Sequence, residues 1–447
     1  MVRKILVTPF QKFVRIESLS GLLLFGATIL ALVAANSPLA DRFHSLWQYK
    51  VGISTSGFEL IKPLILWIND GLMAIFFFLI GLEIKRELLI GELNSLKKVT
   101  FPLFAALGGM LVPVALFLVL NRNPENAHAW GIPMATDIAF TLAILSLLGK
   151  RVPLGLKVFL TAFAIVDDLG AVLVIALFYS QTIKWSLIAV ALVLLAILFY
   201  LSYRNIHAKW LILIFGIVIW VLFLKAGIHP TIAGVLLAFT VPIRQQIGME
   251  TYVDNLCNIV DDIKDAAETD TPLLSGTQIE AIDDLEDWTE KVQSPLQQLE
   301  HRLHNWVAYL IMPLFALSNA GVSFAMEGDL DLSLGGILVI CLVAGKLIGI
   351  TLFSWLSLKL RLAELPPEVR FSQIIGIALL AGVGFTMSIF IANLAFPDQA
   401  HLLDAAKTGI LIGSFLAGIS GYLVLRFTAK NKNRPPKTMH QRAGRKT

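Results

Sequence analysis

The stretch AFAIVDDLGAV, residues 162–172, places two adjacent carboxylates, Asp167 and Asp168, in the middle of an apolar segment. The whole segment covers residues 158–180 and is long enough to cross a lipid bilayer as a helix. On insertion scales an aspartate at the centre of such a helix costs roughly 2.5–3.5 kcal/mol, so the pair needs a partner charge, water or a role in cation binding. We therefore expect a membrane protein in which Asp167 and Asp168 bind a cation and protons alternately.

The composition of the 447-residue chain supports this class of protein. Hydrophobic residues make up 56% of it and charged residues 15%, which is typical of an all-α polytopic membrane protein. Its two cysteines, Cys257 and Cys341, lie in a polar and an apolar segment, so neither a disulfide framework nor a metal cluster is predicted. The chain has no Gly-x-x-x-x-Gly-Lys-Ser/Thr loop for ATP, so we expect transport driven by an ion gradient. We expect neither enzyme activity nor a cofactor.

Twelve apolar segments are candidates for membrane-spanning helices. They cover residues 13–35, 63–82, 99–120, 127–148, 154–179, 185–201, 210–224, 227–241, 306–324, 334–358, 372–396 and 402–427. The seventh and eighth are short and alternatively form one span. Twelve spans place most lysines and arginines on one side, which is then cytoplasmic and holds both termini. The predicted parts are spans one to eight (1–243), an acidic cytoplasmic insertion (244–302), spans nine to twelve (303–428) and a basic cytoplasmic tail (429–447).

Residues 47–60 alternate apolar and polar side chains on both sides of a Ser/Gly turn, which predicts a small extracytoplasmic β-hairpin. An isolated hairpin is marginally stable in water, so we expect it to pack on another element. The same hairpin of a second subunit is one candidate, which would make the protein a homodimer. An ordinary structured loop is the alternative.

The acidic insertion shows helical spacing in two places. Val253, Leu256, Val260 and Ile263 repeat at intervals of three or four residues, and a similar rhythm begins at Ile282. Two short amphipathic helices are therefore expected. The insertion is either a solvated, partly disordered loop around them or a regulatory surface for a partner.

Two apolar segments contain residues that interrupt helices. In the fourth segment Pro133 removes a backbone donor, and Asp137 follows one turn later. In the eleventh, Gly382 and Gly384 precede the hydroxyl residue Thr386. Broken spans in matching positions of two halves are typical of an inverted-repeat transporter with its site at the bilayer midplane. A simple kink, packed by neighbouring helices, is the alternative.

Lys346 carries the charge in the tenth, otherwise uncharged segment. A lysine this deep should pair with a carboxylate or with the carbonyl end of a broken helix. Adjacent helical residues point about 100° apart, so we expect one of Asp167 and Asp168 to pair with Lys346 while the other faces an aqueous funnel. Asp137 would lie at the positive ends of half-helices, and oxygens around Thr136 would complete a site for a small hard cation. A purely structural ion pair is the alternative.

Seven longer motifs follow one another along the membrane portion of the chain. They are WINDGLMAIFFFLIGLEIKREL (67–88), GIPMATDIAFTLAIL (131–145), AIVDDLGAVLVIALFY (164–179), GIHPTIAGV (227–235), LEHRLHNWVAYLIMPLFALSNAGV (299–322), GKLIGI (345–350) and GVGFTMSIFIANLAF (382–396). In this order they resemble the NhaA-type sodium/proton antiporter family, over essentially the whole membrane portion.

The resemblance implies twelve helices with an inverted repeat and two crossed interrupted helices, in a prokaryotic inner membrane. It implies electrogenic export of cytoplasmic sodium or lithium in exchange for external protons, with activation at alkaline pH. The implied partners are these ions, membrane lipid and a second subunit, and not nucleic acid. By motif matching, Asp167 and Asp168 take the ion-binding and proton-binding roles and Asp137 and Lys346 the charge-compensating ones, with Lys346 paired to Asp167.

Glu83, Arg86, Glu87 and Glu300 match the family's cytoplasmic pH-responsive cluster. From their position alone, the first three are equally an interfacial topology anchor. The acidic insertion departs from the family pattern just before Glu300, which puts the pH set point in question rather than the chemistry. Three other functions remain alternatives: a sodium-coupled symporter of an organic anion, a passive cation channel, and a membrane sensor that transports nothing.

Overall fold

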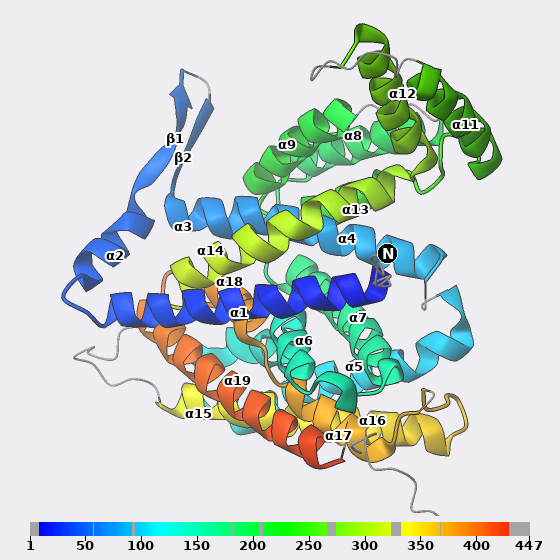
Figure 1. The fold of residues 1–447 in the computed structure, drawn as a ribbon. Coiled ribbons are helices and arrows are strands. Elements are labelled where there is room, and N and C mark those ends of the chain that lie inside the picture. The colour runs from blue at the N-terminus through cyan, green and yellow to red at the C-terminus, as the bar shows by residue number, and fades with distance from the viewer. Residues whose placement is uncertain are drawn as a thin grey trace, which may run out of the picture. The chain divides into compact units, whose positions relative to one another are not determined.

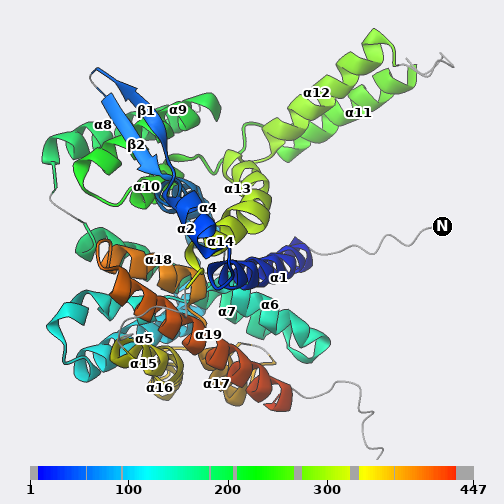
Figure 2. The same ribbon diagram turned by 90° about the vertical axis from the view of Figure 1, so that its left-hand side faces the viewer.

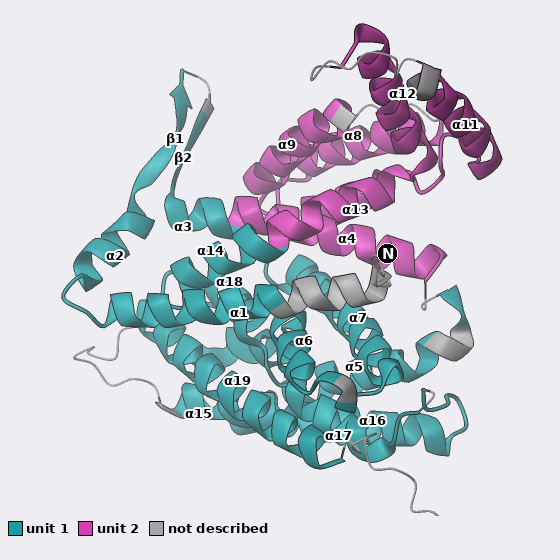
Figure 3. Cartoon of the chain, in the orientation of Figure 1, with its two compact units in different colours: residues 1–69, 92–179, 308–447 teal, residues 70–91, 180–307 magenta. Residues whose placement is uncertain are grey.

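The computed structural model describes residues 9–56, 58–91, 94–180, 183–204, 209–265, 274–322, 332–366 and 368–428. This part of the chain is mostly helical, with one small antiparallel sheet, and it forms two compact units (Figure 3). Unit 1 comprises residues 1–69, 92–179 and 308–447, and unit 2 comprises residues 70–91 and 180–307. The predicted tail, residues 429–447, lies outside the described residues.

Unit 1 consists of helices and one β-hairpin (Figures 1 and 2). Its elements are α1 (Pro9–Ala35), α2 (Ala40–Gln48), β1 (Lys50–Thr55), β2 (Phe58–Pro63), α3 (Leu64–Leu66), α5 (Leu96–Leu120), a 3₁₀ helix (Pro124–Met134), α6 (Ile138–Leu147), α7 (Leu154–Phe178), α14 (Met312–Asn319), α15 (Leu332–Ile340), α16 (Lys346–Lys359), α17 (Phe371–Leu380), α18 (Phe385–Ala395) and α19 (Ala400–Thr428). Single π-helical turns follow α3 (Trp67–Leu72), precede α14 (Val307–Ile311) and join α15 to α16 (Cys341–Gly345).

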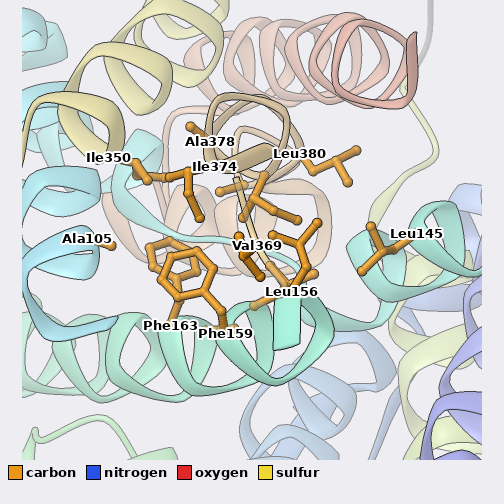
Figure 4. Packing of buried hydrophobic residues seen from close by; sticks show 14 of the residues in the cluster. Ala105, Leu145, Leu156, Phe159, Phe163, Ile350, Val369, Ile374, Ala378 and Leu380 are labelled. Atoms are coloured by element: carbon orange, nitrogen blue, oxygen red, sulfur yellow. The ribbon is translucent and has the colours of Figure 1, made fainter. Parts of the chain in front are cut away.

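The buried core of unit 1 includes one side of α7 (Figure 4). Phe159 and Phe163 of α7 lie in one cluster with Ile350 of α16 and Ile374 of α17, and all four are almost completely buried. The sequence of α7 permits this because it is almost entirely apolar apart from Lys157 near its start and the aspartate pair. Lipid is as apolar as these side chains, so van der Waals packing rather than the hydrophobic effect holds such helices together in a bilayer. The aspartate pair is therefore carried by a tightly packed helix.

Helices α5 and α16 approach closely at a pair of glycines. A Cβ added to Gly108 would lie 2.2 Å from the carbonyl oxygen of Gly349, and a Cβ added to Gly349 would lie 2.1 Å from that of Gly108. Small residues let membrane helices pack backbone to backbone in this way. Because Gly349 follows Lys346 by less than one helical turn, this contact fixes the first turn of α16, where Lys346 lies.

Helical structure breaks at two places in unit 1. The 3₁₀ helix and α6 meet at 49°, and α17 and α18 meet at 46°. At the first break Asp137 has extended backbone (φ −92°, ψ 105°), and Pro133 shortly before it lacks a backbone donor. At the second, a Cβ on Gly382 would lie 2.4 Å from the carbonyl oxygen of Leu342. Glycine is therefore required for the close approach of the two backbones at this break.

The predicted hairpin is confirmed, with shifted bounds. β1 and β2 pair antiparallel from Lys50 opposite Pro63 to Thr55 opposite Phe58, three residues later than the sequence pattern placed the hairpin. The shift arises because Trp47 belongs to the short helix α2, which the pattern did not predict. There its ring packs edge-on against Phe43, with ring centroids 5.8 Å apart.

Unit 2 consists of seven helices among its described residues. They are α4 (Met73–Leu89), α8 (Trp185–Tyr203), α9 (Lys209–Ala226), α10 (Thr231–Thr240), α11 (Met249–Asp265), α12 (Gly276–Val292) and α13 (Pro295–Trp306). The insertion forms two helices, as its spacing predicts, and α11 lies beside α12 (Figures 1 and 2) with Tyr252 Oη 3.1 Å from Thr289 Oγ1. Of the predicted apolar stripe on α11, Val253 and Val260 are exposed, and Ile259 takes the buried position instead.

Six helices in the described part of the chain are long and apolar enough to cross a bilayer. They are Leu64–Leu89, Val99–Leu120, Leu154–Phe178, Trp185–Tyr203, Ser333–Lys359 and Ala400–Thr428. The number rises to nine if three bent helix pairs each count as one span: the two broken helices above, and α1 with α2, which meet at 114°. The apolar stretches in α9 and α10 are shorter. The protein is therefore a multi-pass membrane protein, and twelve spans stays a prediction.

Candidate functional site

The carboxylate of Asp137 accepts hydrogen bonds from the N-termini of two helices, α6 and α18. Asp137 is the N-cap of α6, where its Oδ1 accepts a hydrogen bond from the backbone N–H of Phe140 (3.0 Å). Its Oδ2 accepts from the backbone N–H of Thr386 (3.2 Å) and from Thr386 Oγ1 (2.6 Å), in the first turn of α18. A negative charge at this position is favourable because both helix N-termini carry partial positive charge.

Further hydrogen bonds join the two helix breaks. The Asp137 N–H donates to the carbonyl oxygen of Val383 (2.7 Å). Thr136 Oγ1 donates to the carbonyl oxygen of Ala381 (3.0 Å). All four residues are buried. Carbonyl groups at the second break thus accept hydrogen bonds from an N–H and a hydroxyl group at the first, and no water within a bilayer could replace these bonds.

Lys346 is completely buried at the start of α16, where it contacts two of the residues predicted to form the site. Its Nζ lies 3.1 Å from Asp167 Oδ2 and 3.3 Å from Asp167 Oδ1, and the two side chains form an ion pair. Nζ also donates to Thr136 Oγ1 (2.9 Å) and to the carbonyl oxygen of Met134. Met134 ends the 3₁₀ helix, so the ammonium group faces the negative end of that helix. A carboxylate, a hydroxyl and a carbonyl thus surround the three ammonium protons.

The two aspartates of α7 are both almost inaccessible, with Asp167 1% and Asp168 2% exposed. Adjacent helical positions point about 100° apart, so Asp168 projects from another side of α7 than the carboxylate that Lys346 binds. The carboxylate, hydroxyl and carbonyl oxygens around Lys346 are also the ligands that hard cations prefer. The same oxygens can therefore hold either an ammonium group or a small cation.

In unit 2, the four residues predicted to respond to pH gather on α4 and α13. Arg86 of α4 forms an ion pair with Glu87 of the same helix (2.8 Å) and another with Glu300 of α13. Glu83, one turn before Glu87, faces α13 as well, with its Oε1 3.9 Å from His304 Nδ1. Three carboxylates and one guanidinium thus form a partly buried charge cluster.

Burial raises the pKa of the Glu300 carboxyl above its ordinary value, because the ionised form loses water. The Arg86 guanidinium acts in the opposite direction, and the Glu87 carboxylate raises this pKa further. Glu300 therefore takes up or releases its proton at a higher pH than a free glutamate, beside the arginine that it binds.

Two sets of contacts could not be predicted from the sequence. The first is the bond from Thr386 to Asp137, since the sequence shows only that a hydroxyl residue follows two glycines. The second lies in unit 2, where Asp70 Oδ1 is 3.6 Å from His229 Nε2 and the Asp70 carbonyl accepts from Trp220 Nε1 (2.8 Å). For this second set, the signal in the sequence was a titratable residue in each of two apolar segments, Asp70 in one and His229 in the other.

Comparison with known proteins gives consistent matches over nearly the full chain. A family model described as Na+/H+ antiporter 1 matches residues 11–425. A Na(+)/H(+) antiporter NhaA of Oleidesulfovibrio alaskensis is 49% identical over 432 residues, which cover 96% of this chain and 95% of the relative. Proteins of the same name from Bacteroides thetaiotaomicron (43% over 437 residues, 96% and 99% covered) and Koribacter versatilis (44% over 438 residues, 97% and 94% covered) are also similar.

These matches include every membrane motif quoted above, together with the segments that carry Asp137, Asp167, Asp168 and Lys346. A match of this extent and identity is far beyond what shared composition produces. The chain belongs to the Na+/H+ antiporter 1 family.

Proposed function

We propose that this protein exports cytoplasmic sodium, or lithium in its place, in exchange for external protons. The observation that carries the proposal is the buried ion pair of Lys346 with Asp167, next to a second buried carboxylate on Asp168. Ionisable residues within a membrane mark ion pathways and proton relays. The relatives are named as Na(+)/H(+) antiporters, which supports the same reaction.

The exchange follows from competition for one carboxylate. A sodium ion that binds Asp168 and Asp167 competes with the Lys346 ammonium group for Asp167. Cation binding therefore weakens the ion pair and favours release of protons from Lys346 and from Asp168. Proton uptake on the other side of the membrane restores the ion pair and releases the cation. Since two groups exchange protons, more than one proton moves per sodium ion and the cycle is electrogenic.

Two neighbouring residues have supporting roles in this cycle. Thr136 Oγ1, which accepts from Lys346 in the structure, becomes a cation ligand once the ammonium group withdraws. Asp137 accepts hydrogen bonds from the first turns of α6 and α18 and compensates the positive ends of these helices. The charge that changes during transport is therefore confined to Asp167, Asp168 and Lys346.

We infer that the chain crosses an inner membrane twelve times, with inverted repeats and with its fourth and eleventh spans interrupted. The bends of 49° and 46° support the two interruptions. The distribution of basic residues supports spans in 1–243 and 303–428, with the 244–302 insertion, the 429–447 tail and both termini in the cytoplasm. The bacterial relatives support a prokaryotic inner membrane.

We also propose that the protein is a homodimer through the hairpin, which the sequence pattern placed at residues 47–60 and which the structure forms at Lys50–Pro63. The sheet has only two strands, and every residue of β1 is exposed. A free strand edge offers unpaired N–H and C=O groups to another strand. A second copy of the hairpin would pair with that edge.

We propose further that Glu83, Arg86, Glu87 and Glu300 activate exchange at alkaline pH. The pKa of Glu300 is raised by burial, so its carboxyl ionises and binds Arg86 only as the pH rises through that value. The folded state also holds this proton more tightly than the unfolded state. The stabilisation that the proton provides is therefore present at low pH and lost as the pH rises through the raised pKa.

Glu300→Gln keeps a neutral side chain at every pH. We expect it to move half-maximal activation upward by about one pH unit, because it imitates the protonated, less active form. The pH profile of sodium-driven proton movement measures the shift. Glu290→Gln is the matched control, since Glu290 pairs with Arg302 (2.7 Å) in the same unit but lies outside the Arg86 cluster. Superimposable profiles for Glu300→Gln and wild type would contradict the proposed role.

Everted membrane vesicles test the exchange itself. A proton gradient established by respiration should collapse when sodium or lithium is added to vesicles that contain the protein, and not in vesicles without it. Collapse that requires an added organic anion would favour a symporter instead. Sodium flux without proton movement would favour a channel, and the absence of both would favour a sensor.

A further inference from the structure

A long apolar groove runs along one side of unit 1, apart from the charged residues of the candidate site. Helices α1 and α19 form its two sides, and α6 with the first turn of α18 forms its base (Figure 1). Its volume is about 810 Å³. On α19 the lining residues extend from Thr408 to Leu423, which is roughly 22 Å along the helix axis.

The hydroxyl groups along this groove are used within the protein. Three of them donate to a backbone carbonyl three or four residues earlier in the same helix: Thr28 to Leu24 (2.7 Å), Ser146 to Ala143 (2.7 Å) and Thr408 to Asp404 (2.8 Å). Ser414 Oγ accepts a hydrogen bond from the backbone N–H of Phe385 (3.1 Å). The groove therefore presents a mainly apolar surface, and apolar space of this kind favours hydrocarbon over water.

The edges of the groove face outward. Leu22 and Phe25 of α1 are 64% and 44% exposed, and Ile412 and Phe415 of α19 are 50% and 63% exposed. Helix α19 is long and apolar enough to cross a bilayer, so its exposed apolar side chains meet lipid. The acyl chains of one leaflet cover about half of the hydrocarbon thickness, about 15 Å. One chain therefore fits within the length of the groove.

The base of the groove lies against the two helix breaks. Phe140 in the first turn of α6 and Phe385 in the first turn of α18 both line it, with ring centroids 5.7 Å apart. The Asp137 carboxylate accepts hydrogen bonds from the backbone N–H groups of Phe140 and Thr386 in the same two turns. An acyl chain in the groove therefore packs against both helix starts that Asp137 joins.

A basic residue lies just beyond one end of the groove. Tyr422 lines the groove, and its Oη lies 3.5 Å from Nη1 of Arg426, one turn further along α19. Helix α19 has 29 residues. At 1.5 Å per residue it is about 44 Å long, so its ends extend beyond a hydrocarbon core of about 30 Å into the headgroup region. Arg426 is exposed in the last turn, where a guanidinium group binds phosphate well.

We propose that this groove binds one acyl chain of an anionic membrane phospholipid, whose phosphate group binds Arg426. The bound lipid packs against the first turns of α6 and α18 and stabilises their arrangement. A second copy of the chain is the other candidate occupant of the groove. The simplest alternative is lipid that surrounds the protein without entering the groove. The proposal rests on the membrane-spanning helices and not on the ions that the protein exchanges.

Photolabelling of the full-length protein in liposomes tests whether a chain enters the groove. The probe is phosphatidylglycerol with a photoreactive diazirine near the middle of one acyl chain, in vesicles of phosphatidylethanolamine and phosphatidylglycerol. We expect label on the peptide that contains Phe385, because this residue is 3% exposed and lipid outside the groove does not reach it. Leu411→Trp enlarges a side chain that lines the groove and should remove most of this label.

Leu118→Trp is the matched control for Leu411→Trp. Leu118 is 60% exposed on α5 and does not line the groove, so the label at Phe385 should stay as in the wild type. Label confined to outward-facing residues, and equal in wild type and Leu411→Trp, would overturn the proposal. Absence of label at Phe385 together with conversion of dimers to monomers by Leu411→Trp would also overturn it, since a second copy would then cover the groove.

Arg426→Gln tests the headgroup contact and leaves the lining of the groove unchanged. Native mass spectrometry of the protein in detergent gives its affinity for phosphatidylglycerol and for the zwitterionic phosphatidylcholine. We expect the affinity for phosphatidylglycerol to fall about fivefold, the usual contribution of one basic residue near an anionic headgroup. The affinity for phosphatidylcholine should stay unchanged.

Lys359→Gln is the matched control for Arg426→Gln, because it removes a positive charge from the last turn of another helix of unit 1, α16. It should change neither affinity. Equal affinities of wild type and Arg426→Gln for phosphatidylglycerol would overturn the headgroup contact. If Leu411→Trp does not fold, labelling of the wild type and the affinities of Arg426→Gln still decide the question. Neither measurement depends on sodium/proton exchange, so a failure here is distinct from a failure of the proposed function.

Discussion

Asp168→Asn is expected to abolish sodium-driven proton movement at every pH between mildly acidic and alkaline conditions. Asparagine has nearly the same shape as aspartate and keeps one oxygen, but it carries neither a charge nor an exchangeable proton. A loss of about 3 kcal/mol in cation binding reduces affinity by about 100-fold. The rate of gradient collapse in everted vesicles, measured against sodium concentration and pH, gives the size of the loss.

A variant in which only the proton affinity had changed would recover sodium-driven proton movement at another pH. The measurement therefore covers the whole pH range. Asp283→Asn is the control, since Asp283 lies exposed on α12 in the acidic insertion. It loses the same charge and should keep normal exchange. Coupled exchange by Asp168→Asn at any pH, with wild-type affinity, would show that Asp168 does not bind the ion.

Lys346→Met is expected to lower the free energy of unfolding by about 3–5 kcal/mol, the usual effect of removing one partner of a buried ion pair. Methionine keeps most of the side-chain volume, so the effect comes from the Asp167 carboxylate that is left without its ammonium group. Protonation of Asp167 removes that isolated charge. The deficit should therefore be smallest at acidic pH and grow as the pH rises, which thermal unfolding in detergent at several pH values measures.

The double variant Asp167→Asn with Lys346→Met separates stability from transport. It contains neither charge, so we expect it to recover most of the stability that Lys346→Met loses, but none of the exchange. A double variant as unstable as the single one would mean that Lys346 acts mainly through Thr136 and Met134, which it also contacts. The cycle of four proteins gives the coupling energy of the pair directly.

Local signals in the sequence were sufficient to select part of the candidate site. A charge inside an apolar segment is conspicuous, so Asp167, Asp168 and Lys346 could be selected without a structure. Proline and paired glycines likewise predicted where helical structure ends, because their effect on the backbone needs no tertiary partner. The hairpin was predicted because alternation of side chains is also a local pattern.

Features that depend on how helices are rotated against one another could not be predicted in the same way. From the residues alone, either aspartate of α7 was an equally good partner for Lys346, and only the orientation of α7 selects Asp167. The shared use of Asp137 by α6 and α18 requires both helix starts to meet, which no spacing reveals. Helix α2 was not predicted because it is short and polar. The start of strand β1, which follows α2, was therefore predicted three residues before its observed position at Lys50.

The double role of Asp137 has a mechanical consequence. The Asp137 carboxylate accepts hydrogen bonds from the first turns of both α6 and α18. If one of these helices moved away alone, its backbone amides would lose their hydrogen-bond acceptor within the bilayer, at a cost of several kcal/mol per group. The N-termini of α6 and α18 must therefore move together as one rigid unit whenever the protein changes its conformation. The flexing has to occur elsewhere, at the far ends of these two short helices and in the chain beyond them.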